Sequence, residues 1–344
     1  MPALLIIAWM VRDVRAADGL EPVWDYWSGT ASLRDTMTPT TSASSFVLLV
    51  AYAVAAVAAL RSSAASSVLV VTGVITFVLR LPGVWIISDA AAPEELRDRA
   101  LLTTYAVLAT GIALIVVGAA GRRPVPEGTE RPAGPGRGTG VAVFLLLGFQ
   151  GALFAAWEIR QPFIYPADLY PAWFIGGKPL NLPLTEGPPG WMTVATILIF
   201  LVAAVGAVAG AVHARPLGLF AGGFVLCSGV LGMTRIIHFE MYERFLDLDT
   251  EAQLNLLSFV SSLLVGPVVL VLLARKGVRR ASSGGPQGPW GGAGPWGVQP
   301  PGYPPAGIPG QPAGAPGQSP APAPGFGPPS GGFGPPPSSP PPRW

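Results

Sequence analysis

Charged residues are divided unevenly between the two sides of a series of long apolar runs. If the runs are membrane spans, the connectors on one side carry 11 Lys/Arg and 2 Asp/Glu, and those on the other carry 8 Lys/Arg and 17 Asp/Glu. Membrane proteins keep an excess of Lys and Arg in their cytoplasmic loops. The sequence therefore predicts a multi-pass protein of the plasma membrane whose basic side, with the C-terminus, faces the cytoplasm.

The length of the runs predicts the number of spans, since a helix needs about 20 mostly apolar residues to cross the hydrocarbon core. Seven runs have this length: 40–60, 66–88, 100–120, 141–160, 191–213, 217–238 and 253–274. An eighth, 3–11, is too short to span, and is interpreted either as a signal peptide or as a span whose beginning is missing. We expect an all-α membrane bundle of seven or eight transmembrane helices.

The connectors then fall on two sides. We expect 61–65, 121–140, 213–216 and the C-terminal tail inside, and 12–39, 89–99, 161–190 and 239–252 outside. The outer connector 161–190 has seven prolines and five aromatic residues, so it does not form one long helix. It either packs its aromatic rings at the membrane interface or folds back as a lid over a lipid-like ligand.

Composition supports a membrane protein and excludes several other classes. Only 12% of the 344 residues are charged, whereas a soluble globular chain has about 25%. No basic cluster interleaved with aromatic residues indicates nucleic-acid binding. Arginine outnumbers lysine by 19 to 2, and Ala, Gly and Pro are abundant, which is typical of a GC-rich bacterial genome.

The chain has two halves with one plan, a span and a long outer loop followed by three closely spaced spans. An offset of 155 residues places Arg80 on Arg235 and Gly111 on Gly266. Upstream, AWMVR at 8–12 resembles AWEIR at 156–160, with a slightly different offset. We predict a tandem duplication of a four-helix unit with parallel halves. Its parts are a first half (1–120), a Pro/Gly linker (121–140), a second half (141–275) and a tail (276–344).

Small residues recur four apart in the second half. Gly206 and Gly210 lie on one face of the 191–213 span, and Gly218 and Gly222 on one face of the 217–238 span. Such faces let helix backbones approach closely. We expect the two faces to pack within this hairpin.

A few ionisable residues lie within or beside spans, where charge is costly and usually faces a bundle interior or a watery cavity. We predict a polar site open to the outer side; its candidate residues are Arg80, Arg235, His238, Glu158 and Glu240. A guanidinium suits phosphate or carboxylate, so the expected ligand is anionic or lipid-like. The alternative interpretation is structural, in which the arginines reach the head groups or pair with Glu158 or Glu240.

The sequence contains no motif typical of a metal site, a cofactor site or a common enzyme class. The single cysteine, Cys227, allows no intrachain disulfide, and two histidines give no zinc or haem spacing. No P-loop, dinucleotide fingerprint, HExxH, GxSxG or CxxC motif is present. We therefore expect no cofactor or metal, and the sequence does not favour an enzyme.

The tail has 21 prolines and 17 glycines among residues 281–344. Such a segment buries too little surface to fold, so disorder is predicted, and Pro-rich segments can dock in aromatic grooves of partner proteins. Three functions remain open. The first is transport or ligand binding at the outer polar site; the second is a non-catalytic scaffold with a cytoplasmic partner for the tail; the third is an enzyme acting on lipid-linked substrates.

Overall fold

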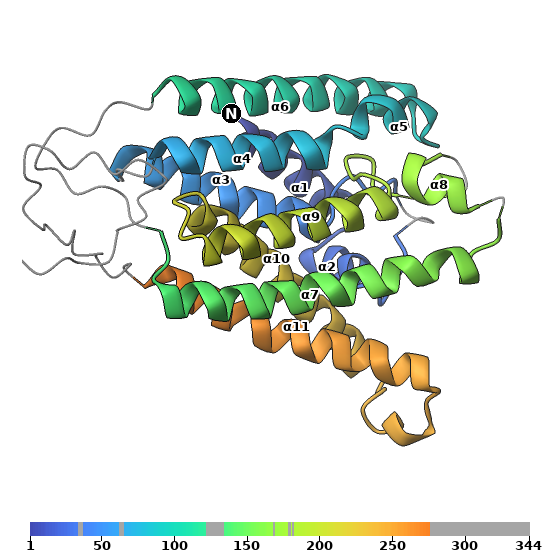
Figure 1. The fold of residues 1–344 in the computed structure, drawn as a ribbon. Coiled ribbons are helices and arrows are strands. Elements are labelled where there is room, and N and C mark those ends of the chain that lie inside the picture. Colours follow the sequence, from blue (N-terminus) through green and yellow to red (C-terminus); the bar gives the residue numbers. More distant parts are fainter. Residues whose placement is uncertain are drawn as a thin grey trace, which may run out of the picture. The chain divides into compact units, whose positions relative to one another are not determined.

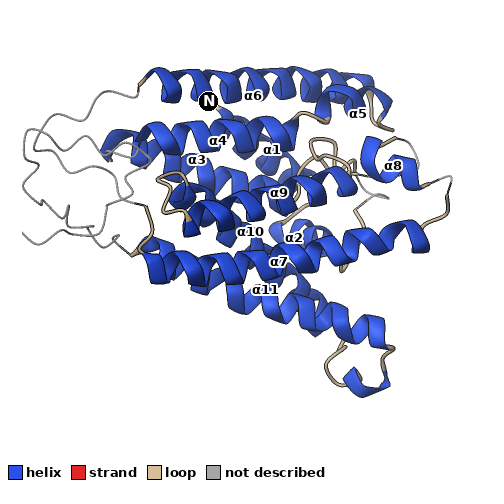
Figure 2. Ribbon diagram, in the orientation of Figure 1, coloured by secondary structure: helices blue, strands red, loops and turns tan. Residues whose placement is uncertain are grey.

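A computed structural model describes residues 1–33, 37–61, 65–121, 134–167, 169–177, 180 and 182–275 of the chain. All described elements are helices, and this part of the chain contains no strand (Figure 2). The helices are α1 (Pro2–Ala16), α2 (Leu20–Ser28), α3 (Ala43–Arg61), α4 (Ala65–Arg80), α5 (Gly83–Asp89), α6 (Glu94–Ala120), α7 (Arg137–Ile164), α8 (Tyr170–Ile175), α9 (Pro189–Val208), α10 (Ala214–His238), the short 3-10 helix η1 (Phe245–Asp247) and α11 (Thr250–Ala274).

Seven helical segments are long and apolar enough to cross a membrane, which confirms the all-α fold class and supports a multi-pass membrane protein. The long helices run side by side, with α5 and α8 at one end (Figure 1). Because this end carries the acidic connectors, we call it the predicted outer end. The predicted cytoplasmic tail and most of the predicted linker lie outside the described residues.

The helix boundaries differ from the predicted spans at several ends. The predicted span 66–88 is divided into α4 and α5 by a turn at Leu81 and Pro82, since proline lacks the N–H that would continue the helix. The predicted span 191–213 ends earlier, at Val208, where α9 gives way to a turn. Apolar composition continues through both turns, so hydropathy alone does not detect them.

The short N-terminal run forms α1, which continues beyond the predicted 3–11 to Ala16. It packs against α2, α3 and α6, and Ile6 is buried in the core. The predicted outer connector 12–39 thus contains the end of α1 and the whole of α2.

The core is shared by α1, α3, α4, α7, α9, α10 and α11, and small side chains such as Ala204 allow the helices to pack closely. Its fully buried members include Val143, Phe200 and Ala204. Gly218 and Gly222 do not face α9 as expected. A Cβ atom on Gly218 would lie 2.4 Å from Leu273, and one on Gly222 would lie 3.1 Å from Val269, so this face packs on α11.

Two tryptophans make matching hydrogen bonds in the two halves. The Trp9 indole N–H of α1 donates to Thr103 Oγ1 of α6 at 3.2 Å, and the Trp157 indole N–H of α7 donates to Ser258 Oγ of α11 at 3.1 Å. Each hydroxyl also donates to a carbonyl four residues earlier, at 2.8 and 2.7 Å. The two hydroxyl residues are separated by the 155 positions that relate Arg80 to Arg235.

The helix crossings of the two halves also occur at matching positions. A Cβ atom on Gly111 would lie 3.2 Å from the Gly73 carbonyl oxygen, where α6 crosses α4, and one on Gly266 would lie 2.6 Å from the Leu226 amide nitrogen, where α11 crosses α10. Gly111 and Gly266 are again 155 residues apart. A side chain at Gly266 would clash with the backbone of α10, and one at Gly111 would make a tight contact with the backbone of α4.

Candidate functional site

Arg80 ends α4 at the turn before α5, and only 8% of its surface is exposed. Its Nη2 donates to Ser45 Oγ of α3 at 3.0 Å, and its Nη1 donates to the carbonyl oxygen of Thr185. Thr185 lies in the long connector before α9. The guanidinium thus joins two helices of the first half to a loop of the second half.

Asp13, at the end of α1, is the most heavily hydrogen-bonded acid of the described chain. It is 1% exposed and accepts four hydrogen bonds, from the amides of Thr40 and Thr41 at 3.1 and 2.8 Å and from their hydroxyls at 2.6 and 2.7 Å. Arg12 Nη1 lies 2.9 Å from the same carboxylate and also donates to the Thr38 carbonyl oxygen at 2.6 Å. Hydrogen bonds to a charged acceptor are among the strong ones, so this carboxylate fixes the segment that precedes α3.

The connector before α9 is held on this segment. Leu184 N donates to the Pro39 carbonyl oxygen at 3.0 Å, and Thr185 donates from its amide and its hydroxyl to the Thr40 carbonyl oxygen, at 3.1 and 2.6 Å. A continuous hydrogen-bonded chain therefore runs from Asp13 through Thr40 and Thr185 to Arg80. We call the connected set the polar junction: Arg12, Asp13, Thr40, Thr41, Ser45, Arg80 and Thr185.

Glu186 follows the junction and adds an acid next to it. Loss of solvent around the half-buried side chain raises the pKa of its carboxyl above 4.5, while hydrogen bonds from Ser42 and Ser44 and the positive charge of Arg80 act in the opposite direction. Because desolvation is the largest of these effects, the protonated form is favoured at higher pH than in an exposed glutamate.

A small cavity of about 20 Å³ lies beside Arg80, enough for one water molecule or an ion of similar size. Its walls combine hydroxyl side chains, the guanidinium and three apolar side chains: Thr41, Ser45, Thr103, Thr104, Thr185, Arg80, Ile6, Trp9 and Val107. A guanidinium has five N–H donors, and the bonds to Ser45 and Thr185 use two of them. Donors therefore remain for an occupant of the cavity.

Arg235, which the predicted 155-residue offset places on Arg80, lies in a different setting. It is exposed, its Nε donates to the Ser28 carbonyl oxygen at 3.1 Å, and its Cζ lies 5.9 Å from the ring centroid of Phe259. Ser28 is the last residue of α2, and Gly29 ends this helix with a left-handed φ of 72°. A cation is favourable at the carbonyl end of a helix, so Arg235 fastens α2 to α10.

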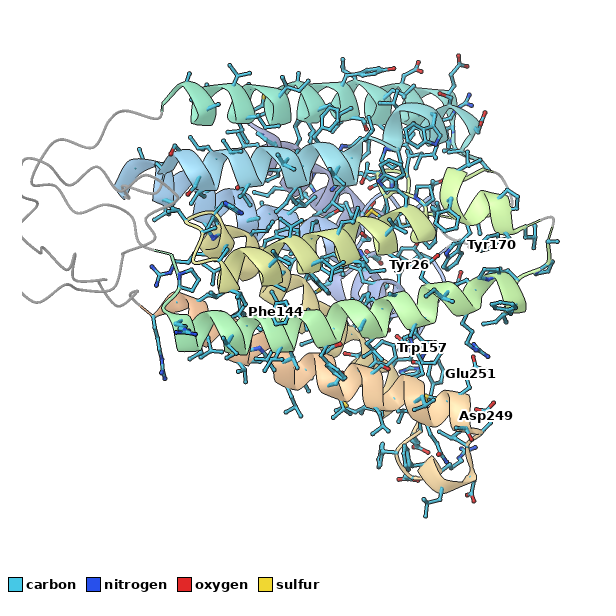
Figure 3. All side chains as sticks on the ribbon, viewed as in Figure 1. Tyr26, Phe144, Trp157, Tyr170, Asp249 and Glu251 are labelled. Atoms are coloured by element: carbon cyan, nitrogen blue, oxygen red, sulfur yellow. The ribbon has the colours of Figure 1, made fainter. Side chains whose placement is uncertain are left out.

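The remaining predicted site residues occupy three further places. Glu158 is 9% exposed and accepts a hydrogen bond from the Trp173 indole of α8 at 2.8 Å. His238 and Glu240 are exposed, and the ring centroid of His238 lies 4.8 Å from that of Phe239. In Figure 3, Trp157 lies on the side of α7 that faces α11, with Glu251 nearer the end of the bundle, where it pairs with Arg160.

The five predicted residues thus have separate surroundings. Within the described part of the chain, no hydrogen bond or ion pair joins two of them. Sequence reasoning identified Arg80 but missed Asp13, Thr40, Thr41 and Thr185. The available signals were an acid directly after the apolar run 3–11 and the hydroxyl-rich segment TPTTSAS at 38–44.

The described residues contain no group of three or more His, Cys, Asp or Glu side chains that could hold a metal ion. Neither a protein-family model, nor a curated protein, nor a solved structure matches this chain. Functional inference therefore rests on the polar junction and on the surroundings of the two arginines.

Proposed function

We propose that this membrane protein binds or transports a small anion at the cavity beside Arg80, reached from the predicted outer side. The observation that carries the proposal is the cavity itself, whose walls combine a buried guanidinium with unused donors, hydroxyl-bearing side chains and apolar side chains. Buried cations are expensive unless paired and hydrogen-bonded. An anion in the cavity would accept those donors and balance the charge.

The size of the cavity narrows the ligand class. About 20 Å³ excludes a lipid head group or an organic acid of several carbons in this conformation, whereas a halide is close in size to a water molecule. Among the described residues, no hydrogen bond uses the hydroxyl hydrogens of Ser45 and Thr104. These two neutral donors suit an anion, because they stabilise negative charge without adding a fixed counter-charge. We therefore assign the cavity to a chloride-sized inorganic anion.

The proposal includes a tandem duplication with two parallel halves. It is supported by the matched Trp9–Thr103 and Trp157–Ser258 hydrogen bonds and by the matched glycine crossings. Each arginine also contacts the other half, since Arg80 donates to Thr185 in the connector before α9 and Arg235 donates to Ser28 at the end of α2. Repeats that rock against each other around a central site are a common plan of transporters, and the two arginine contacts would act as closures on the predicted outer side.

The scaffold function is the alternative, and one observation bears on how it would work. The Gly218 and Gly222 face is filled by α11 within the chain, so it is not free to bind a partner in the membrane. A scaffold would then depend on the tail, for which we retain a cytoplasmic protein partner as a proposal. The plasma membrane of a bacterium, with the tail inside, remains the proposed location.

The proposal is tested by the anion dependence of thermal unfolding of the purified full chain in detergent. Sodium chloride is compared with sodium gluconate, an anion too large for the cavity, at equal ionic strength. We expect saturable stabilisation by chloride alone, and loss of this stabilisation in Thr104→Val, which keeps the volume of the wall but removes a hydroxyl.

Thr110→Val is the matched control, because Thr110 lies on the same helix but does not line the cavity. It should respond to chloride as the wild type does. Equal stabilisation by chloride and gluconate, or an unchanged chloride response in Thr104→Val, would refute the anion site. Deletion of 276–344 provides the contrast, since the scaffold alternative predicts loss of cellular function with no effect on the chloride response.

A further inference from the structure

Arg235 combines exposure with a fixed orientation, unlike Arg80. Its Nε is held by the Ser28 carbonyl oxygen, and no other hydrogen bond or ion pair engages it among the described residues. The terminal Nη1 and Nη2 atoms are therefore free to bind. A guanidinium with its two outer nitrogens available has the fork geometry that binds phosphate through two parallel hydrogen bonds.

The depth of Arg235 fits a lipid phosphate. It follows the first residue of α10 by 21 positions, about 31 Å at 1.5 Å per residue, and a hydrocarbon core is about 30 Å thick. If α10 begins at the inner boundary of the hydrocarbon core, Arg235 reaches the level of the outer head groups.

The surface around Arg235 suits acyl chains. Phe239, which directly follows α10 and lies four positions from Arg235, is exposed, as is Trp24 on α2, one turn before Ser28. His238 lies one turn from Arg235 on the same face. The Arg235 guanidinium fits here because Gly29 has no side chain. A Cβ atom at position 29 would lie 2.6 Å from Arg235 Nη2. Apolar side chains thus flank a cationic group at head-group depth.

We infer that Arg235, assisted by His238, binds the phosphate of an outer-leaflet phospholipid. This site is separate from the cavity beside Arg80 and does not depend on the function proposed for it. A dissolved phosphate ion offers the same chemistry, so the test below compares the two sources. The bilayer itself holds lipid phosphates at the head-group level that Arg235 reaches, so we assign the site to a lipid phosphate.

The test is native mass spectrometry of the full chain in detergent with added phosphatidylglycerol, or with diacylglycerol of the same acyl chains as the phosphate-free probe. We expect the wild type to retain phosphatidylglycerol selectively. Arg235→Gln should weaken retention about ten- to a hundredfold, the range for removing a hydrogen-bonding partner of a charged group. Arg244→Gln is the matched control, because it removes the same charge from the exposed outer loop after α10 and should leave retention unchanged.

Thermal unfolding of each variant shows whether it is folded. If Arg235→Gln does not fold because α2 loses its cation, Arg235→Lys and His238→Ala take its place, and both should reduce retention while preserving the fold. Equal retention of phosphatidylglycerol by wild type and the folded Arg235 variants overturns the inference. Displacement of the lipid by millimolar inorganic phosphate overturns the lipid assignment in favour of a soluble anion.

Discussion

The Asp13 carboxylate gives the sharpest prediction of stability. In Asp13→Ala the amides of Thr40 and Thr41 lose their acceptor in a buried setting. Each orphaned buried donor costs about 1–3 kcal/mol, so these two amides alone predict a loss of about 2–6 kcal/mol in the free energy of unfolding. Asp89→Asn is the control, since Asp89 is exposed at the same end of the bundle and should change stability by less than about 0.5 kcal/mol.

Removing a threonine hydroxyl provides a second measurement of how much the bonds to Asp13 contribute to stability. Thr40→Val removes the 2.6 Å bond from Thr40 Oγ1 to Asp13 and should cost about 1.5–3 kcal/mol, the range for hydrogen bonds to charged groups. In an Asp13→Ala background the same change should cost much less, because its partner is already absent. Unfolding is followed by tryptophan fluorescence in mixed micelles of increasing dodecyl sulfate fraction. An equal cost of Thr40→Val in both backgrounds would show that the threonine stabilises the fold by other means.

Three further predictions concern charge, packing and the matched halves. The raised pKa of Glu186 means that folding favours its protonated form. The wild type should therefore gain stability relative to Glu186→Gln as pH falls from the raised pKa towards 4.5. Parallel pH profiles of melting temperature for the two proteins would contradict this. Gly73→Ala should destabilise the chain by about 1–3 kcal/mol, because its Cβ would lie 2.5 Å from the Gly111 carbonyl oxygen, whereas Gly148→Ala, with open space around it, should be neutral or stabilising in the same melts. Trp9→Phe and Trp157→Phe should each remove one hydrogen bond worth about 0.5–1.5 kcal/mol; if only one of them lowers stability in the unfolding assay, the matched contacts are not equivalent.

Hydropathy and charge predicted the spans because the bilayer alone determines how long and apolar a span must be and where charged residues can lie. Seven of the predicted runs correspond to helices that can cross a membrane. The α4–α5 turn was not predicted, although Pro82 marks it, because hydropathy averages over a break of two residues. The extent of α1 was also missed, since its last turn is polar and is held by Asp13 contacts that a local pattern does not encode.

The candidate site was predicted only in part, for the same physical reason. The cost of charge in a membrane singles out Arg80 from sequence, but its partners Ser45 and Thr185 are 35 and 105 residues away. Hydroxyl residues such as Thr40 and Thr41 are common at helix starts, so they give no signal until the fold places a carboxylate beside them. The separation of Arg80 from Arg235, Glu158 and His238 likewise depends on how the two halves pack.

The most direct test of the central claim is accessibility of the cavity beside Arg80 from outside the cell. Ser45→Cys, a nearly isosteric change in the cavity wall, is made in a Cys227→Ala background and exposed in intact cells to a small, membrane-impermeant thiol reagent. Ser45 is 1% exposed in this conformation, so the reagent reaches position 45 only when the proposed closures on the outer side open. Ser88→Cys, exposed at the predicted outer end, and Ala120→Cys, exposed at the opposite end, provide the two reference positions. We expect Ser45→Cys to be labelled from outside, more slowly than Ser88→Cys, and to be protected by chloride but not by gluconate. Labelling of Ser45→Cys only after permeabilisation, as for Ala120→Cys, or labelling that chloride does not slow, would contradict an outward-facing anion site.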